Sequence, residues 1–160
     1  HLSEHIEAKK RIYQRYQEGL KELPVKLNPY DSGKSEPNYW LTCLLIEKDA
    51  MCRQVRGDKE VLYIGEHGKS CPTEILETLA LFNAEGRPIW KPMHLQPYYR
   101  NHDFITCNGT GRARSDAYIN HEIVDVGADI FARGLCLPSD NKMTQEEQNI
   151  IIELIHYCFE

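Results

Sequence analysis

The densest group of side chains that could bind a ligand lies in one stretch, Arg87–Tyr99. It holds two cations, an imidazole, an amide and three aromatic rings. Its three prolines lower the entropy lost when an extended segment is held in one shape, which suits a loop that faces a ligand. Rings of this kind can stack on a base or a sugar, while Lys, Arg and Gln can bind phosphate or hydroxyl groups.

A structural role fits the same stretch. Ile89, Trp90 and Met93 can be core residues, and His94 can be a partly buried histidine with a hydrogen-bond partner. From the residue types alone, this structural interpretation is favoured over ligand binding.

Other motifs that carry chemistry are absent from the sequence. It contains no His-Glu-x-x-His, Gly-x-Ser-x-Gly or Walker motif, and no Cys/His cluster with the spacing of metal ligands. Gly109 and Gly111 lack the third glycine of a dinucleotide-binding fingerprint and favour a plain loop. Three histidines stand among polar residues and are expected to be solvated: His67, His102 and His121.

The cysteines are isolated from one another in the sequence, and none forms a Cys-x-x-Cys pair. Cys43 lies in a strand-like run, and Cys158 lies on the apolar stripe of the last helix, where a small hydrophobic residue packs well. We therefore expect reduced, mainly structural thiols in a cytosolic protein, and no metal site. The six are Cys43, Cys52, Cys71, Cys107, Cys136 and Cys158.

Composition narrows the class of protein. A chain of 160 residues can form one domain with a real core, and we expect a single domain over residues 1–160. The net charge of −5 argues against nucleic-acid binding, which needs a dense positive surface. No apolar run approaches the roughly 20 residues that cross a bilayer, and no signal peptide opens the chain. A soluble cytoplasmic protein without membrane contact is expected.

Three amphipathic patterns predict the main helices. Apolar residues spaced by three, four and seven predict a helix over residues 3–23 that Pro24 ends. This helix begins almost at the first residue, which we interpret as the mark of a chain cut from a longer one. Pro72 is predicted to open a second helix that Gly86 ends. Thr144 and Glu147 predict a capping box at the start of the final helix.

The remaining segments predict a small sheet and further connections. Residues 39–46 are apolar on both faces and predict a central strand. The other expected elements are an excursion over 53–69 with one short edge strand at 61–64, a strand from Arg87 leading into a loop by Gln96, a polar loop over 98–114, a helix over 115–133 with a break near Gly127, and a strand at 135–137. This order predicts an α+β fold, with a small, mainly antiparallel sheet packed with helices on one side.

Two motifs are similar to those of a known family. The first is Trp90–Pro97 followed by Tyr99, and the second is Phe131–Ser139 followed by the closing amphipathic helix. Both resemble the DegT/DnrJ-type sugar aminotransferases, which use pyridoxal phosphate (PLP). The opening helix with Arg11, Tyr13 and Tyr16, and the Tyr39-Trp40 pair, fit as well. The resemblance covers nearly the whole chain, and its two motifs are specific only together.

The resemblance implies that residues 1–160 are the small C-terminal domain of a fold type I enzyme. In that family a large N-terminal domain carries PLP on a lysine, and no residue here matches that lysine. The sequence around Lys34 resembles its setting over too few residues to count as a match. The parent enzyme would move an amino group, from glutamate, to a nucleotide-linked keto sugar for polysaccharide synthesis, with PLP as the electron sink. This chain alone would contain no catalytic residue, bind no cofactor and be inactive.

The resemblance also implies that the loop around His94 faces the substrate pocket. His94 and Gln96 would contact the sugar or the cofactor-bound substrate, and Lys91 a phosphate or a neighbouring carboxylate. Tyr98 and Tyr99 would line the mouth of the pocket. The expected partners are the nucleotide sugar, the missing PLP-binding domain and, in the full-length enzyme, a second copy.

Two alternatives remain open at the level of sequence. The chain could be a free-standing, non-catalytic binding or interaction module derived from this domain. It could also come from a PLP-dependent dehydratase relative in which the anchoring lysine is replaced.

Overall fold

The computed structural model describes residues 1–28, 30–31, 33–56, 61–99, 102, 104–106, 109–111 and 125–160. The chain divides into two compact units. The first comprises His1–Pro88 with Arg133–Glu160, and the second comprises Ile89–Ala132. The single domain over residues 1–160 stays a prediction. No helix in the described parts of the chain is both long enough and apolar enough to cross a membrane.

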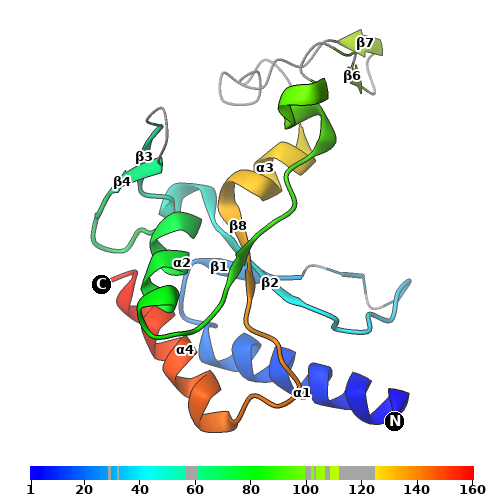
Figure 1. Ribbon diagram of the computed structural model, residues 1–160, viewed down its shortest axis with the longest axis vertical. Coiled ribbons are helices and arrows are strands. Elements are labelled where there is room, and N and C mark those ends of the chain that lie inside the picture. Colours follow the sequence, from blue (N-terminus) through cyan, green and yellow to red (C-terminus); the bar gives the residue numbers. More distant parts are fainter. Residues whose placement is uncertain are drawn as a thin grey trace. The chain divides into compact units, whose positions relative to one another are not determined.

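A four-stranded antiparallel sheet forms the centre of the first unit (Figure 1). Its strands are β1 (Val25–Leu27), β2 (Thr42–Ile46), β8 (Gly134–Leu137) and β5 (Arg87–Pro88), in that spatial order. β2 lies in the middle of the sheet, as its apolar sequence predicts, and β8 lies beside it. The predicted mainly antiparallel α+β fold is confirmed.

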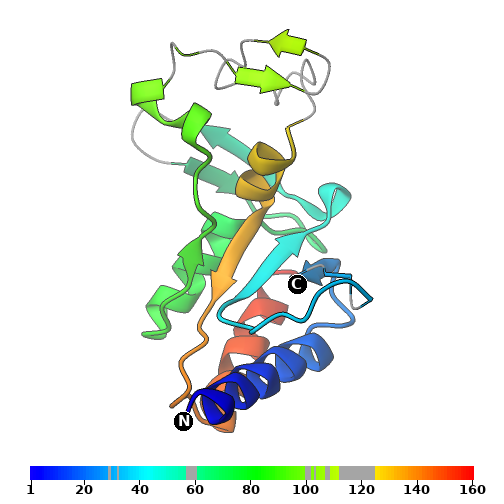
Figure 2. The same ribbon diagram turned by 90° about the vertical axis from the view of Figure 1, so that its right-hand side faces the viewer.

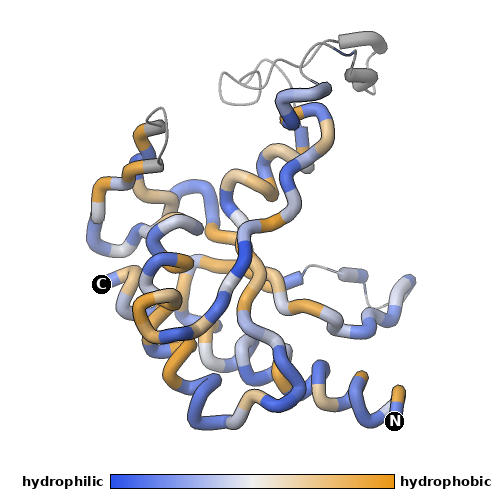
Figure 3. Tube along the Cα trace, viewed as in Figure 1, coloured by the Kyte–Doolittle hydropathy of each residue, from blue (hydrophilic) through white to orange (hydrophobic). Residues whose placement is uncertain are grey.

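Three helices supply the rest of the core: α1 (Leu2–Gly19), α2 (Pro72–Leu81) and α4 (Gln145–Tyr157). Figure 2 shows α1 and α4 side by side, and hydrophobic residues follow β2 and β8 in Figure 3. Alternate residues of these strands face the helices because side chains in a strand alternate between its two faces. The largest fully buried apolar side chains of this core are Tyr16, Leu20, Leu44, Ile46, Ile75, Leu79, Leu135, Leu137 and Ile155.

Local sequence explains how α4 begins. The side chain of Thr144 accepts a hydrogen bond from the Glu147 backbone N–H at 3.2 Å, and the Glu147 carboxylate accepts one from the Thr144 N–H at 2.7 Å. This reciprocal pair satisfies two donors that the first turn leaves open. The predicted capping box is confirmed.

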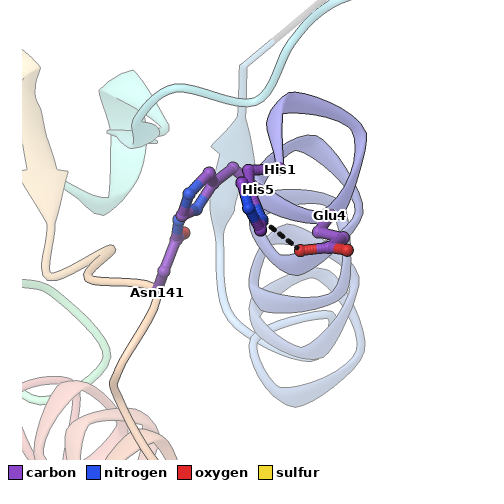
Figure 4. A network of polar contacts seen from close by, with 4 residues as sticks. All are labelled: His1, Glu4, His5 and Asn141. Atoms are coloured by element: carbon purple, nitrogen blue, oxygen red, sulfur yellow. Dashed lines mark hydrogen bonds and ion pairs between the residues drawn. The ribbon is translucent and has the colours of Figure 1, made fainter.

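The start of α1 is tied to the loop that precedes α4. Asn141 Nδ2 lies 2.7 Å from His5 Nδ1, while His1 and Glu4 form an exposed contact of 3.3 Å (Figure 4). The His1–Glu4 contact adds little stability because water screens both groups. The Asn141 contact fixes the chain entering α4 against α1.

The end of α2 differs from the prediction. Pro72 is the first residue of the helix, as expected, but the helix ends at Leu81 and the left-handed residue after it is Asn83, with φ of 58°. Asparagine tolerates this conformation better than most residues. Gly86 instead lies in a tight place, where an added Cβ would stand 2.7 Å from Leu76 Cδ2. Phe82, which directly follows the helix, is 60 % exposed.

The strand predicted at residues 39–46 begins only at Thr42. Tyr39 has φ of 53°, which an extended strand cannot include. Its ring packs on Tyr13 at a centroid distance of 4.9 Å, and its hydroxyl lies 3.1 Å from that of Tyr30. Aromatic packing therefore accompanies a backbone conformation that the residue type disfavours.

The excursion after β2 contains two paired strands rather than one. A short helical turn, η1 (Lys48–Ala50), is followed by β3 (Arg53–Arg56), which pairs antiparallel with β4 (Val61–Ile64). A parallel bridge between Met51 and Ser70 closes this excursion at its base.

The structure corrects three predictions about residues 87–133. The extended run from Arg87 is a strand only as far as Pro88, since Pro92 and the residues after it form tight helical turns. The predicted polar loop contains β6 (Phe104–Thr106) paired with β7 (Gly109–Gly111). The predicted helix over 115–133 appears as α3 (Val126–Arg133), unbroken at Gly127, and residues 115–124 lie outside the described parts.

Candidate substrate-binding site

Two short helical turns shape the segment that carries the candidate residues. They are η2 (Met93–Leu95) and η3 (Pro97–Tyr99). Pro92 precedes the first turn and Pro97 opens the second, where a fixed φ favours the bend and a missing N–H costs nothing. Backbone hydrogen bonds of 3.0 Å close the turns, from Leu95 to Pro92, from Gln96 to Met93 and from Tyr99 to Gln96.

Leu95 anchors this segment, because it is the one buried residue of η2. His94 and Gln96 flank it and are half-buried, while Lys91 and Tyr98 are exposed and Tyr99 is half-buried. The turn thus holds its polar side chains at the surface on a fixed backbone. This arrangement suits residues that contact a ligand.

Asp125 holds the imidazole of His94. His94 Nε2 forms an ion-pair contact with Asp125 Oδ2, and the two side chains are 16 % and 6 % exposed. The other oxygen, Oδ1, accepts a hydrogen bond of 2.9 Å from the backbone N–H of Ala128. One carboxylate therefore caps the first turn of α3 and fixes the histidine ring.

A carboxylate behind a histidine sets the orientation of the ring and the identity of the nitrogen that carries the proton. Here the same carboxylate belongs to a helix N-terminus, so the ring is tied to an ordered element rather than to a lone side chain. A Cβ added to Gly127 would stand 3.4 Å from Pro92 Cγ, which shows how closely the first turn of α3 approaches the histidine segment. His94 is held in a defined position.

The structure links Gln96 to Lys91 through the backbone. Gln96 Nε2 donates to the Lys91 carbonyl oxygen at 3.4 Å, a long hydrogen bond that folds the segment back on itself. This link restrains the Gln96 amide, while the Lys91 side chain is exposed, and its long stem allows the ammonium group to reach an anion.

Tyr98, Tyr99 and His102 form a cluster of three rings. The Tyr98 and Tyr99 centroids are 5.1 Å apart in an edge-to-face arrangement. His102 lies 6.4 Å from Tyr98 and 5.7 Å from Tyr99, and its backbone N–H donates to the Tyr99 carbonyl at 3.0 Å. Sequence spacing predicted an isolated, solvated His102, and the turn at Tyr99 instead brings its ring beside the two tyrosines.

This group of residues can bind a ligand but offers no evident nucleophile. It combines a held imidazole, an amide, an exposed ammonium and aromatic rings, which together suit a phosphorylated or hydroxylated ring compound. A lysine that binds PLP covalently needs an enclosed setting that lowers its charge. None of the lysines in the described parts of the chain is buried, so these residues do not fit the anchor of that cofactor.

Asp125 is the functional candidate that sequence reasoning did not find. It lies 31 residues after His94 in the chain, near the middle of the helix predicted over residues 115–133. A local signal existed, because Asp followed by Val126, Gly127 and Ala128 fits a helix N-cap. The spacing of residues in the sequence does not, however, predict that Asp125 contacts His94.

The sequence is similar to that of a curated protein. The chain is 33 % identical over 160 residues to a Bacillus subtilis (strain 168) protein named "Putative pyridoxal phosphate-dependent aminotransferase EpsN". The match covers 99 % of this chain and 32 % of that protein. No protein-family model matches the chain.

Solved structures share the fold. A DegT DnrJ EryC1 StrS aminotransferase from Brucella abortus matches with a TM-score of 0.62 and 20 % identity, over 96 % of this chain and 31 % of its own. DesI, crystallised in the presence of its TDP-sugar product, gives a TM-score of 0.67 and 17 % identity, over 98 % and 32 %. An E. coli GDP-4-keto-6-deoxy-D-mannose-3-dehydratase with bound hydrated PLP gives 0.59 and 14 %, over 95 % and 31 %.

The chain thus spans about one third of the length of the proteins that it matches. Similarity in sequence and similarity in fold both extend from end to end of the 160 residues. The resemblance to the DegT/DnrJ-type, PLP-dependent sugar aminotransferases is therefore confirmed, and the chain has the α+β fold of their small C-terminal domain.

Proposed function

We propose that this chain is the substrate-side domain of a PLP-dependent aminotransferase that moves an amino group from glutamate to a nucleotide-linked keto sugar. The Schiff-base lysine belongs to a separate, larger PLP-binding domain. The isolated chain neither binds the cofactor nor turns over substrate, and the complete enzyme acts as a homodimer. The nucleotide-sugar class is supported by the similar fold of DesI, whose structure was determined in the presence of its TDP-sugar product.

The observation that carries this proposal is the contact between His94 and Asp125. A structural histidine needs only one hydrogen-bond partner from a nearby backbone. His94 has a nearly buried carboxylate that also caps a helix, and such a support costs desolvation. Orienting an imidazole in this way is of use to a binding site that must discriminate between hydroxyl positions of a sugar.

The neighbouring residues divide the substrate between them. The ammonium group of Lys91 binds the diphosphate, and the amide of Gln96 forms a hydrogen bond with a sugar hydroxyl. The rings of Tyr98 and Tyr99 present flat apolar surface at the mouth of the site, suited to stacking on a base. PLP, when bound to the larger domain, supplies the electron sink for the transfer.

One other reaction has an observation in its favour. The fold is shared with a PLP-containing sugar dehydratase, so the fold itself is compatible with removal of a hydroxyl group as well as with amino transfer. The lysine of the larger domain separates the two, because transamination needs it and a dehydratase relative replaces it. A free-standing binding module remains the alternative from another class.

Substitution of His94 and Asp125 in the full-length enzyme tests the proposal. We expect His94→Ala and Asp125→Asn each to lower kcat/KM for a nucleotide-linked keto sugar by about 10–100-fold, because each removes a polar contact or its support. Asn caps helices as well as Asp, so Asp125→Asn should leave the melting temperature nearly unchanged.

His67→Ala is the matched control. His67 is an exposed histidine, and its ring forms a hydrogen bond with the backbone carbonyl of Glu160. Its kcat/KM should equal that of the parent enzyme. Unchanged kcat/KM in both His94→Ala and Asp125→Asn would exclude His94 from the substrate site.

A further inference from the structure

Two buried thiols and one carboxylate meet in the first unit, away from the candidate substrate residues in sequence. The side-chain ligand atoms of Cys52, Cys71 and Glu74 all lie within 4.8 Å of one another. Both cysteines are buried, with 4 % and 0 % of their surface exposed, and Glu74 is half-buried. Spacing alone did not predict this cluster, because the two cysteines are 19 positions apart in the chain.

Backbone pairing fixes the two cysteines next to each other. Met51 and Ser70 form a parallel bridge, the Cys52 N–H donates to the Ser70 carbonyl at 3.0 Å, and the Ser70 N–H donates to the Ala50 carbonyl at 3.0 Å. Cys52 and Cys71 are the next residues along the two bridged segments. Their thiols are therefore held together by main-chain hydrogen bonds rather than by side-chain packing alone.

The third group comes from the first turn of α2. Cys71 is the N-cap of this helix and Glu74 is its third residue. Ser70 Oγ donates to Glu74 Oε2 at 2.8 Å and so orients the carboxylate. Thiolate and carboxylate are the forms of these side chains that bind metal ions.

We propose that Cys52, Cys71 and Glu74 form a binding site for one Zn²⁺ ion. Zn²⁺ accepts thiolate and carboxylate ligands together, whereas Mg²⁺ and Ca²⁺ prefer oxygen ligands alone. Tetrahedral ligands at zinc distances stand roughly 3–4 Å apart, so the observed cluster needs only small side-chain rotations. A water molecule fills the fourth position.

Binding exchanges protons for the ion. Each thiol releases its proton to solvent as its sulfur bonds to Zn²⁺, so one ion displaces two protons and no electron is transferred. Because zinc binding releases these protons, zinc affinity should increase as pH rises from 6 to 8.

A metal titration of the full, reduced chain tests the site. After treatment with a chelator, Co²⁺ should produce an intense thiolate-to-cobalt charge-transfer band that saturates at one equivalent. Zn²⁺ should abolish this band and bind with a Kd of about 10 nM or tighter in competition with a chromogenic chelator. Cys52→Ser, Cys71→Ser and Glu74→Gln should each weaken zinc binding by at least about 100-fold.

Cys43→Ser is the matched control, because Cys43 contacts Cys136 rather than this cluster. It should bind Zn²⁺ as the parent chain does. Glu74→Gln keeps the test valid if a cysteine variant misfolds, since glutamine can still accept the Ser70 hydrogen bond. The site is refuted if Co²⁺ gives no thiolate band, if all three substitutions leave zinc affinity unchanged, or if anaerobically purified protein contains a Cys52–Cys71 disulfide and no metal.

Discussion

At the scale of the residue, Asp125 is the side chain that gives the candidate site its order. Its two oxygens serve different partners, one the imidazole of His94 and the other the first turn of α3. Removal of the whole Asp125 side chain would therefore loosen both the His94 ring and the start of α3. The same carboxylate explains why His94, on a short turn at the surface, can act as a fixed group.

Tyr16 couples stability to pH at this same scale. It is fully buried, and its hydroxyl donates to the Pro138 carbonyl at 2.8 Å. Burial raises the pKa of Tyr16 above its ordinary value near 10. A group whose pKa is raised on folding stabilises the fold fully below its unfolded pKa and loses that contribution as pH rises toward its folded pKa.

We therefore expect the free energy of unfolding to fall above about pH 10, by up to about 1.4 kcal/mol per pH unit from this residue. Tyr16→Phe should be less stable at pH 8, because the Pro138 carbonyl loses its donor, and should decline less between pH 10 and 11. Urea unfolding at each pH measures both effects. Tyr157→Phe, at a 68 % exposed position, should behave as the parent, and an equal alkaline decline in Tyr16→Phe would contradict the assignment.

The sequence predicts which residues of one segment could bind a ligand, but it does not predict which residues of distant segments contact one another. The segment from Trp90 to Tyr99 stood out because its residue types were concentrated locally. His94 meets Asp125, and Cys52 meets Cys71, because distant segments of the chain come together in the fold. The spacing of these residues in the sequence does not predict such contacts.

At the scale of the element, the central sheet depends on tight packing where β5 meets β8. A Cβ on Gly86 would stand 2.7 Å from Leu76 Cδ2, 3.2 Å from Leu79 Cδ1 and 3.3 Å from the Cys136 carbonyl oxygen. The side-chain ends can yield, but the carbonyl belongs to β8 and cannot. Glycine is required here for close approach rather than for its backbone freedom.

Gly86→Ala should therefore destabilise the chain by about 1–3 kcal/mol. Gly65→Ala is the control, because an added Cβ there meets no atom within 4 Å. Urea unfolding of the two variants beside the parent chain measures the difference. A loss below about 0.5 kcal/mol in Gly86→Ala would show that β5 and β8 adjust without cost.

Amphipathic periodicity predicted α1, α2 and α4 because each buries one stripe against the sheet. Their ends were harder to predict. Asn83 rather than Gly86 takes the left-handed position, and Tyr39 keeps a positive φ while packed between Tyr13 and Tyr30. Propensity alone predicts Gly86 for the left-handed position and an extended strand at Tyr39. Tertiary contacts override propensity at both positions.

At the scale of the whole molecule, the chain accounts for about one third of the proteins it resembles. Its described lysines are exposed or half-buried, and its candidate site contains groups that bind and orient. The proposed function divides the labour, so that this domain would contact the sugar and a larger domain would hold the cofactor and perform the chemistry. The zinc site proposed at Cys52 would be independent of that division.

Location of the PLP-bearing lysine tests this division most directly. The complete gene product that carries this chain is incubated with PLP, reduced with borohydride, digested and mapped by mass spectrometry. We expect one stoichiometric phosphopyridoxyl-lysine, on a peptide outside these 160 residues, and no stoichiometric label on the 160-residue chain treated alone. A stoichiometric phosphopyridoxyl group on any lysine of this chain would contradict the account.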